Sequence, residues 1–119
     1  MTTILILEGN TPDMVAGGQM ASGGFVQSFA VLAPEASVKI LNPYARAFSA
    51  HVLEGISGVV FTGAGVAWST DAPEAAPMHR WMEGVLKAGL PIWGSCNGMQ
   101  LAAVVLGGAV GASPNGIEV

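Results

Sequence analysis

The sequence predicts an α/β fold in which an open parallel sheet is covered by helices on both faces. Short runs that are apolar at nearly every position alternate with longer segments whose apolar residues fall at helical spacing. Such alternation is typical of parallel sheets built from strand–helix–strand units, whose strands are buried on both faces. The 17 glycines cluster between these segments and punctuate them as turns.

In the first half of the chain, residues 3–7 form an apolar run that predicts the first, buried strand. Residues 11–24 are rich in Gly, Ser, Pro and Asp, so we expect a loop there. Helical spacing of apolar residues over 25–32 predicts a helix, with Ser22 as its N-cap and Pro34 as its stop. A second strand is expected over 37–41, and at most a short helix over 49–53.

In the second half, residues 58–61 predict a third strand. The clearest helix spans 71–89, because Met78, Trp81, Met82, Val85 and Leu86 make one apolar stripe opposite His79, Arg80, Glu83 and Lys87. A fourth strand is expected over 90–93, with Trp93 in the core. Residues 97–106 predict a helix that is apolar nearly all round and therefore buried. Together these elements predict a flavodoxin-like open sheet.

Composition excludes several classes of function. The net charge is −4 and the four Lys and Arg are scattered, which argues against a nucleic-acid partner. No secretory signal and no membrane-length apolar stretch are present, so we expect a cytoplasmic protein. His, Cys, Asp and Glu show no metal-ligand spacing, and no nucleotide-binding glycine pattern occurs. We therefore expect neither a metal nor another cofactor.

The single cysteine, Cys96, stands where the fourth strand turns into the helix that follows. Gly94 and Gly98 flank it at two residues on either side. A tight strand-to-helix turn brings backbone segments close together, and glycine fits where a side chain would clash. The N-terminus of the following helix favours a thiolate. Taken alone, a single cysteine is more often a small buried hydrophobe, but this placement favours a nucleophile.

The run from Gly94 to Gln100 resembles the G-x-C-x-G-x-Q signature of class I glutamine amidotransferases. The resemblance implies that Cys96 attacks the side-chain amide of L-glutamine, forms a γ-glutamyl thioester and releases ammonia. It also implies that the backbone N–H of Asn97 stabilises the oxyanion and that Gln100 helps to hold the substrate. The ammonia would pass to a synthetase domain or partner.

In this family the second oxyanion donor comes from a glycine-rich turn after an earlier strand. The matching turn here begins at Thr62, directly after the predicted third strand. The resemblance points to the N–H of Ala64 as the donor, with Gly63 as its flexible neighbour. Trp68, farther along the same loop, could line the pocket.

The sequence departs from the family in one respect. The family's general-base histidine lies downstream of the cysteine, and this sequence has no counterpart to it. His51 and His79 both precede Cys96, and we expect both on the surface. The resemblance therefore implies that residues 1–119 form the N-terminal half of a class I domain, truncated after the helix that follows Cys96. With half of its residues hydrophobic and 10% charged, such a piece is expected to self-associate.

Two alternatives stay open at this point. A cysteine hydrolase or a relative of the PfpI and DJ-1 group could use the same strand-to-helix turn, although these proteins typically lack a glutamine at the position of Gln100. A flavodoxin-like binding module with an inert thiol would not be an enzyme at all.

Overall fold

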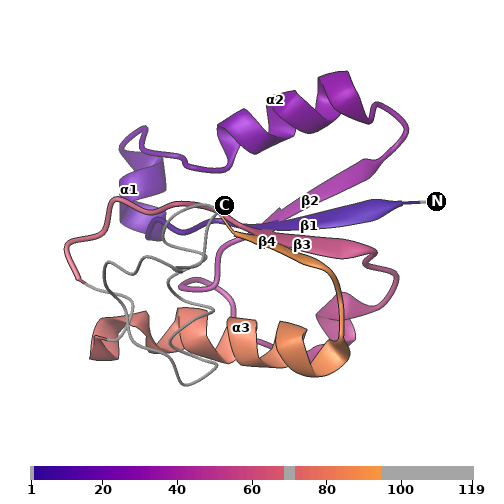
Figure 1. Ribbon diagram of the computed structural model, residues 1–119. Helices are drawn as coiled ribbons and strands as arrows, with labels where there is room; N and C mark the ends of the chain where they lie inside the picture. The colour runs from indigo at the N-terminus through magenta and orange to yellow at the C-terminus, as the bar shows by residue number, and fades with distance from the viewer. Residues whose placement is uncertain (1, 69–71, 95–119) are drawn as a thin grey trace, which may run out of the picture.

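The computed structural model describes residues 2–68 and 72–94 of the chain. They form three layers, with a parallel sheet between helices on its two faces (Figure 1). The strands are β1 (Thr3–Leu7), β2 (Ser37–Leu41), β3 (Gly58–Phe61) and β4 (Ile92–Gly94). The α-helices are α1 (Pro12–Ala16), α2 (Gly23–Leu32) and α3 (Ala76–Ala88), and two 3₁₀ turns are η1 (Ala50–Leu53) and η2 (Pro73–Ala75).

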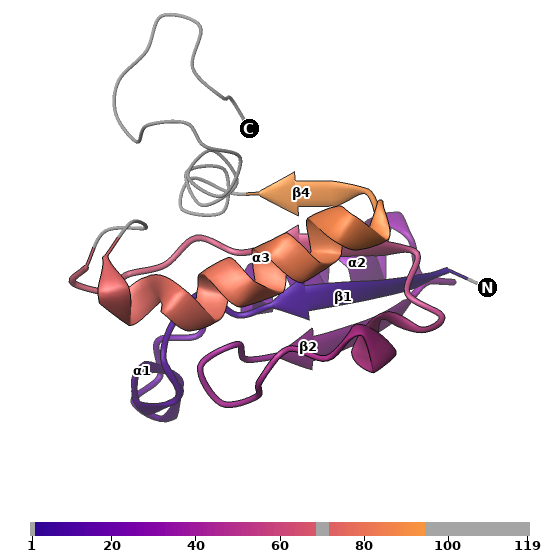
Figure 2. The ribbon, with the colours of Figure 1, turned by 90° about the horizontal axis from the view of Figure 1, so that it is seen from below.

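The strand order is β2-β1-β3-β4, and each neighbouring pair is parallel. Leu7 at the end of β1 lies opposite Leu41 and Phe61, and Phe61 lies opposite Gly94. The carboxyl ends of all four strands therefore meet at one edge of the sheet, beside which α1 lies (Figures 1 and 2). This arrangement confirms the predicted flavodoxin-like α/β fold.

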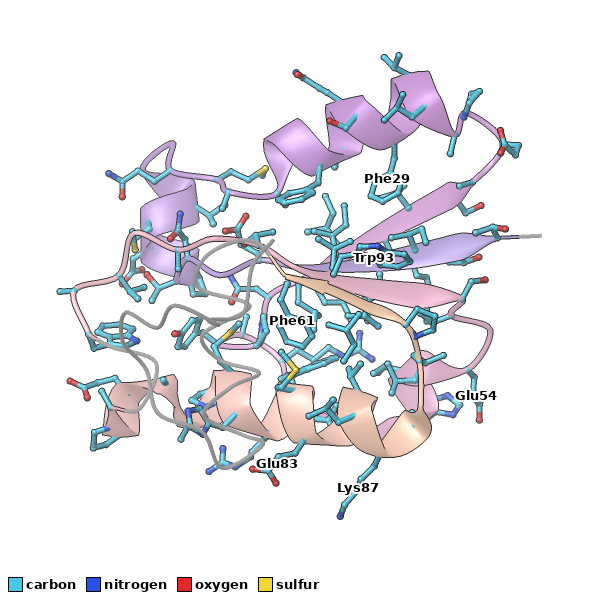
Figure 3. The ribbon with its side chains drawn as sticks, in the orientation of Figure 1. Phe29, Glu54, Phe61, Glu83, Lys87 and Trp93 are labelled. Carbon is cyan, nitrogen blue, oxygen red and sulfur yellow. The ribbon has the colours of Figure 1, made fainter. Side chains whose placement is uncertain are left out.

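Two apolar layers hold the helices to the sheet, and Figure 3 shows one residue of each: Phe29 of α2 points to one face, and Phe61 points to α3. The α3 layer contains the predicted stripe, because Met78, Trp81, Met82 and Val85 are all buried. A glycine in the left-handed conformation, Gly89 with φ 71°, ends α3 where the sequence predicted.

The structure corrects several predictions for the first helical region. Residues 11–24 are not a plain loop, because they contain α1 and the first two residues of α2. Thr11 caps α1, with its side-chain oxygen accepting a hydrogen bond from the Met14 N–H, and Pro12 occupies the first turn. Ser22 is the N-cap residue of α2 as predicted, but its side chain makes no capping bond, and its buried hydroxyl has no partner among the described residues.

Two further corrections concern side-chain exposure. Trp93 is 53% exposed, although its apolar strand predicted a core position. Its ring packs over Gly58, where an added Cβ would lie 2.5 Å from the indole. His79 is half-buried and has an interaction partner, so the prediction of a surface histidine was wrong. His51 is on the surface as predicted, 3.2 Å from Glu54.

Candidate functional site at the carboxyl edge of the sheet

The order in which the chain adds strands reverses between β1 and β3. From β1 the chain crosses one face of the sheet to reach β2, and from β3 it crosses the other face to reach β4 (Figure 1). In open α/β sheets, ligands bind beyond the carboxyl ends of strands near such a switch point. Here that place is occupied by two short segments, Glu8–Gly9–Asn10 after β1 and Thr62–Gly63–Ala64–Gly65 after β3. We call the second segment the 62–65 loop.

The 62–65 loop is fastened to the end of β1 by hydrogen bonds at both of its ends. At the first, the Gly9 N–H donates to Thr62 Oγ1 over 2.7 Å, and the Thr62 hydroxyl donates to the Gly63 carbonyl. At the second, the Gly65 N–H donates to Asn10 Oδ1, also over 2.7 Å. Within the described residues, the N–H groups of Gly63 and Ala64 have no hydrogen-bond acceptor.

Close contact between these segments requires glycine at position 9. A Cβ built there would lie 2.6 Å from the Gly63 carbonyl oxygen and 3.1 Å from the Ala64 Cβ. Such distances are not tolerated by a side chain without movement of the backbone it meets. The position of the 62–65 loop is therefore coupled directly to the end of β1.

Glu8 is a buried carboxylate behind this contact, 2% exposed. One oxygen accepts hydrogen bonds from the N–H groups of Asn10 and Ala21, and the other accepts from Ser22. The carboxylate thus lies at the N-terminal end of α2, where a negative charge is stabilised by the helix dipole and free amides. From the sequence, no role was assigned to the side chains of Glu8, Asn10 and Thr62, although each is a polar residue that follows an apolar strand.

Aromatic residues lie on the loops that flank the site. Trp68 Nε1 donates to the Tyr44 hydroxyl over 3.2 Å, and the two rings meet edge to face with centroids 6.0 Å apart. Burial raises the pKa of Tyr44 above its ordinary value, while the Trp68 hydrogen bond lowers it. The prediction that Trp68 lines a substrate pocket stays a prediction.

One cavity of about 260 Å³ lies beside the 43–48 loop and α3, and another of about 440 Å³ lies alongside β2. Neither is lined by Gly63 or Ala64. No group of three or more His, Cys, Asp or Glu side chains that could hold a metal occurs within residues 2–68 and 72–94. In the same ranges, no helix has the length and hydrophobicity needed to cross a bilayer.

The predicted site residues divide into two sets. Gly63 and Ala64 are described, and they lie at the carboxyl end of β3, next to β4. Cys96, Asn97 and Gln100 lie outside the described residues, as does the helix predicted over 97–106. Their roles in catalysis and substrate binding therefore stay predictions.

Comparison with known proteins supports a class I glutamine amidotransferase-type region in this chain. The relative that supports it is the protein named GMP synthase [glutamine-hydrolyzing] of Aeropyrum pernix, which is 48% identical over 65 residues. The match includes 54% of this chain but only 12% of the relative's length. No family model and no solved structure matches the sequence.

Proposed function

We propose that this chain carries the nucleophile and part of the oxyanion site of a glutamine-hydrolysing amidotransferase. The observation that carries the proposal is the 62–65 loop, whose Gly63 and Ala64 amides have no acceptor in the described part of the chain. This loop lies beside β4, the strand that leads to Cys96. The relative's name, which specifies glutamine hydrolysis, supports the same activity.

The strand register supports the pairing of Cys96 with this loop. Gly94, the last residue of β4, lies opposite Phe61, the last residue of β3. Cys96 follows two residues later, and two residues of chain reach at most about 7 Å. The proposal therefore puts the thiol and the Ala64 amide at the carboxyl ends of two adjacent strands, as a shared reaction centre requires.

In the proposed reaction, the Cys96 thiolate attacks the Cδ carbon of L-glutamine, and the carbonyl oxygen becomes an oxyanion. The N–H groups of Ala64 and Asn97 donate hydrogen bonds to this oxyanion, with Gly63 allowing the turn, and Gln100 helps to hold the substrate. The amide nitrogen takes up a proton and leaves as ammonia, which gives the γ-glutamyl thioester. Water then hydrolyses the thioester to glutamate and regenerates the thiol.

A general base for these proton transfers is not supplied by His51. This residue pairs with Glu54, which Figure 3 shows near the C-terminal end of α3, away from α1 and the carboxyl edge. The proposal therefore assigns the base to residues other than this pair. It also includes a synthetase domain or partner as the ammonia acceptor, self-association of the chain, and a location in the cytoplasm.

The buried Glu8 carboxylate argues against a flavodoxin-like module that binds a phosphate at the N-terminus of α2. It already accepts the Ala21 and Ser22 amides at that end of the helix. A second anion placed there would meet a like charge in a poorly solvated site.

The test is covalent labelling of the full natural protein by 6-diazo-5-oxo-norleucine, an electrophilic analogue of glutamine. We expect one adduct, located on Cys96 by peptide mass spectrometry. L-glutamine should protect the site from labelling. The Cys96→Ser variant, which keeps the size of the side chain, should give no adduct. A folded full protein that remains unlabelled and releases no ammonia from glutamine would disprove the proposal.

A further inference from the structure

Asn10 is the residue through which the end of β1 holds the 62–65 loop. It is 7% exposed, and all of its backbone and side-chain polar groups are hydrogen-bonded. Its N–H donates to Glu8 Oε2 over 2.9 Å, and its side-chain Nδ2 donates to the Gln19 carbonyl over 2.8 Å. Its own carbonyl accepts from Asn42 Nδ2, and its side-chain Oδ1 accepts from the Gly65 N–H.

Three of these four bonds fix Asn10 itself, and the fourth acts on the loop. The bonds to Glu8, Gln19 and Asn42 fix the backbone and the amide plane of Asn10. Its Oδ1 is then held at a defined point, from which it binds the Gly65 N–H. A hydrogen bond from a rigid, buried partner restricts the loop more than a bond to a mobile side chain would.

We propose that Asn10 is a positioning residue that sets the direction of the Gly63 and Ala64 amides by holding Gly65. This inference rests on the proposed function for its catalytic consequence. The loop is tied at Thr62 by the Gly9 amide and at Gly65 by Asn10, so the Gly63 and Ala64 amides, which have no acceptor among the described residues, lie between two fixed points. Preorganised donors of this kind stabilise an oxyanion because they need no reorientation during the reaction.

Asparagine suits this role better than aspartate. Aspartate would keep an acceptor for Gly65 but would lose the donor to the Gln19 carbonyl, and it would add a carboxylate near Glu8. Asn10→Asp is therefore the conservative variant, which preserves the bond to the loop alone. Asn10→Ala removes both side-chain bonds.

The first experiment measures amide hydrogen exchange in the full natural protein, using a peptide that spans residues 58–68. In Asn10→Ala, we expect the Gly65 amide to exchange at least tenfold faster, whereas Asn10→Asp should retain its protection. Asn42→Ala is the comparison variant, because it removes one of the three bonds that fix Asn10, together with the bond from the Tyr44 N–H, but keeps the Oδ1 acceptor of Gly65. This variant should speed the exchange of Gly65 less than Asn10→Ala does.

The inference is overturned if a folded Asn10→Ala protein keeps its Gly65 protection, or if Asn42→Ala loses that protection equally. Loss of protection in Asn10→Asp also overturns it, and this variant decides the matter should Asn10→Ala not fold. Because exchange is read without substrate, a wild-type protein that does not hydrolyse glutamine would refute the proposed function while leaving the exchange result standing.

The second experiment measures glutaminase kinetics. We expect Asn10→Ala to lower kcat by ten- to a hundredfold with KM changed less than threefold, since the amides it positions act on the transition state. Asn10→Asp should recover most of kcat. A matching fall in the amount of folded enzyme, with kcat per folded molecule unchanged, would reduce Asn10 to a structural role and overturn the inference.

Discussion

Gly9→Ala is the substitution that tests most directly how closely the end of β1 and the 62–65 loop are packed. The added Cβ would lie 2.6 Å from the Gly63 carbonyl oxygen, whereas ordinary van der Waals contact begins at 3.4 Å. The carbonyl must therefore retreat by most of an ångström. Because Thr62 Oγ1 bonds both the Gly9 N–H and this carbonyl, the movement disturbs two hydrogen bonds together.

The expected cost follows from two opposing effects. Inserting a methyl group into a well-packed site costs about 1–3 kcal/mol. Replacing glycine restricts the unfolded chain and returns about 0.4–1 kcal/mol. We therefore expect Gly9→Ala to lower the free energy of unfolding by about 1.3 kcal/mol, the difference between the midpoints of these two ranges.

Gly24→Ala is the matched control, because the same methyl group there meets nothing within 4 Å and lies in the first turn of α2. It should leave stability unchanged or raise it by up to about 1 kcal/mol. Urea unfolding of both variants measures the difference, and 6-diazo-5-oxo-norleucine labelling of folded Gly9→Ala should also be slower. Equal midpoints and equal labelling rates for the two variants would refute the packing argument.

Two further predictions concern α3 and the loops that follow β2 and β3. Gly84→Ala should destabilise the protein by about 1–3 kcal/mol in urea unfolding, because its Cβ would overlap the Phe48 ring. Combining it with Phe48→Leu should recover much of the lost stability. If the effects of the two substitutions on stability simply add, the contact is contradicted. Tyr44, the single tyrosine, should ionise above its ordinary 10.0 in a spectrophotometric titration, because burial raises its pKa. The stability linked to this proton is complete below pH 10.0 and is lost as pH rises through the raised pKa of Tyr44. Trp68→Phe should raise the pKa of Tyr44 further, because it removes the hydrogen bond that lowers it. A titration curve unchanged by this substitution would contradict the hydrogen bond.

The sequence predicted the elements whose pattern is local. The stripe of Met78, Trp81, Met82 and Val85 shows helical spacing, and the buried strands β1 and β3 are continuous apolar runs. The helix α1 was missed because a short segment with Thr, Pro and Asp has the composition of a loop. Only its order, with a capping threonine followed by proline, favoured a helix start.

Features set by position within the fold could not be predicted in this way. Trp93 follows the apolar pattern of a buried strand, but β4 has β3 as its one neighbour in the described sheet, and 53% of Trp93 is exposed. The polar contacts of the site join residues more than fifty positions apart, as in Asn10 with Gly65. A periodic pattern gives the face on which a residue lies, but not the strand that becomes its neighbour.

The parallel register connects these contacts to the proposed chemistry. Because Leu7 lies opposite Phe61, the residues that follow them, Glu8–Gly9–Asn10 and Thr62–Gly65, leave the sheet side by side. A slip of one residue would turn the Thr62 side chain to the other face of the sheet and remove the acceptor of the Gly9 amide. The same slip would move Leu5, Leu7, Val59 and Phe61 from the α3 layer to the opposite apolar layer, which is filled by side chains of other shapes, so several core positions would have to repack together. Core packing therefore fixes the register, and the register in turn brings the Gly63 and Ala64 amides to the edge where β4 leads to Cys96.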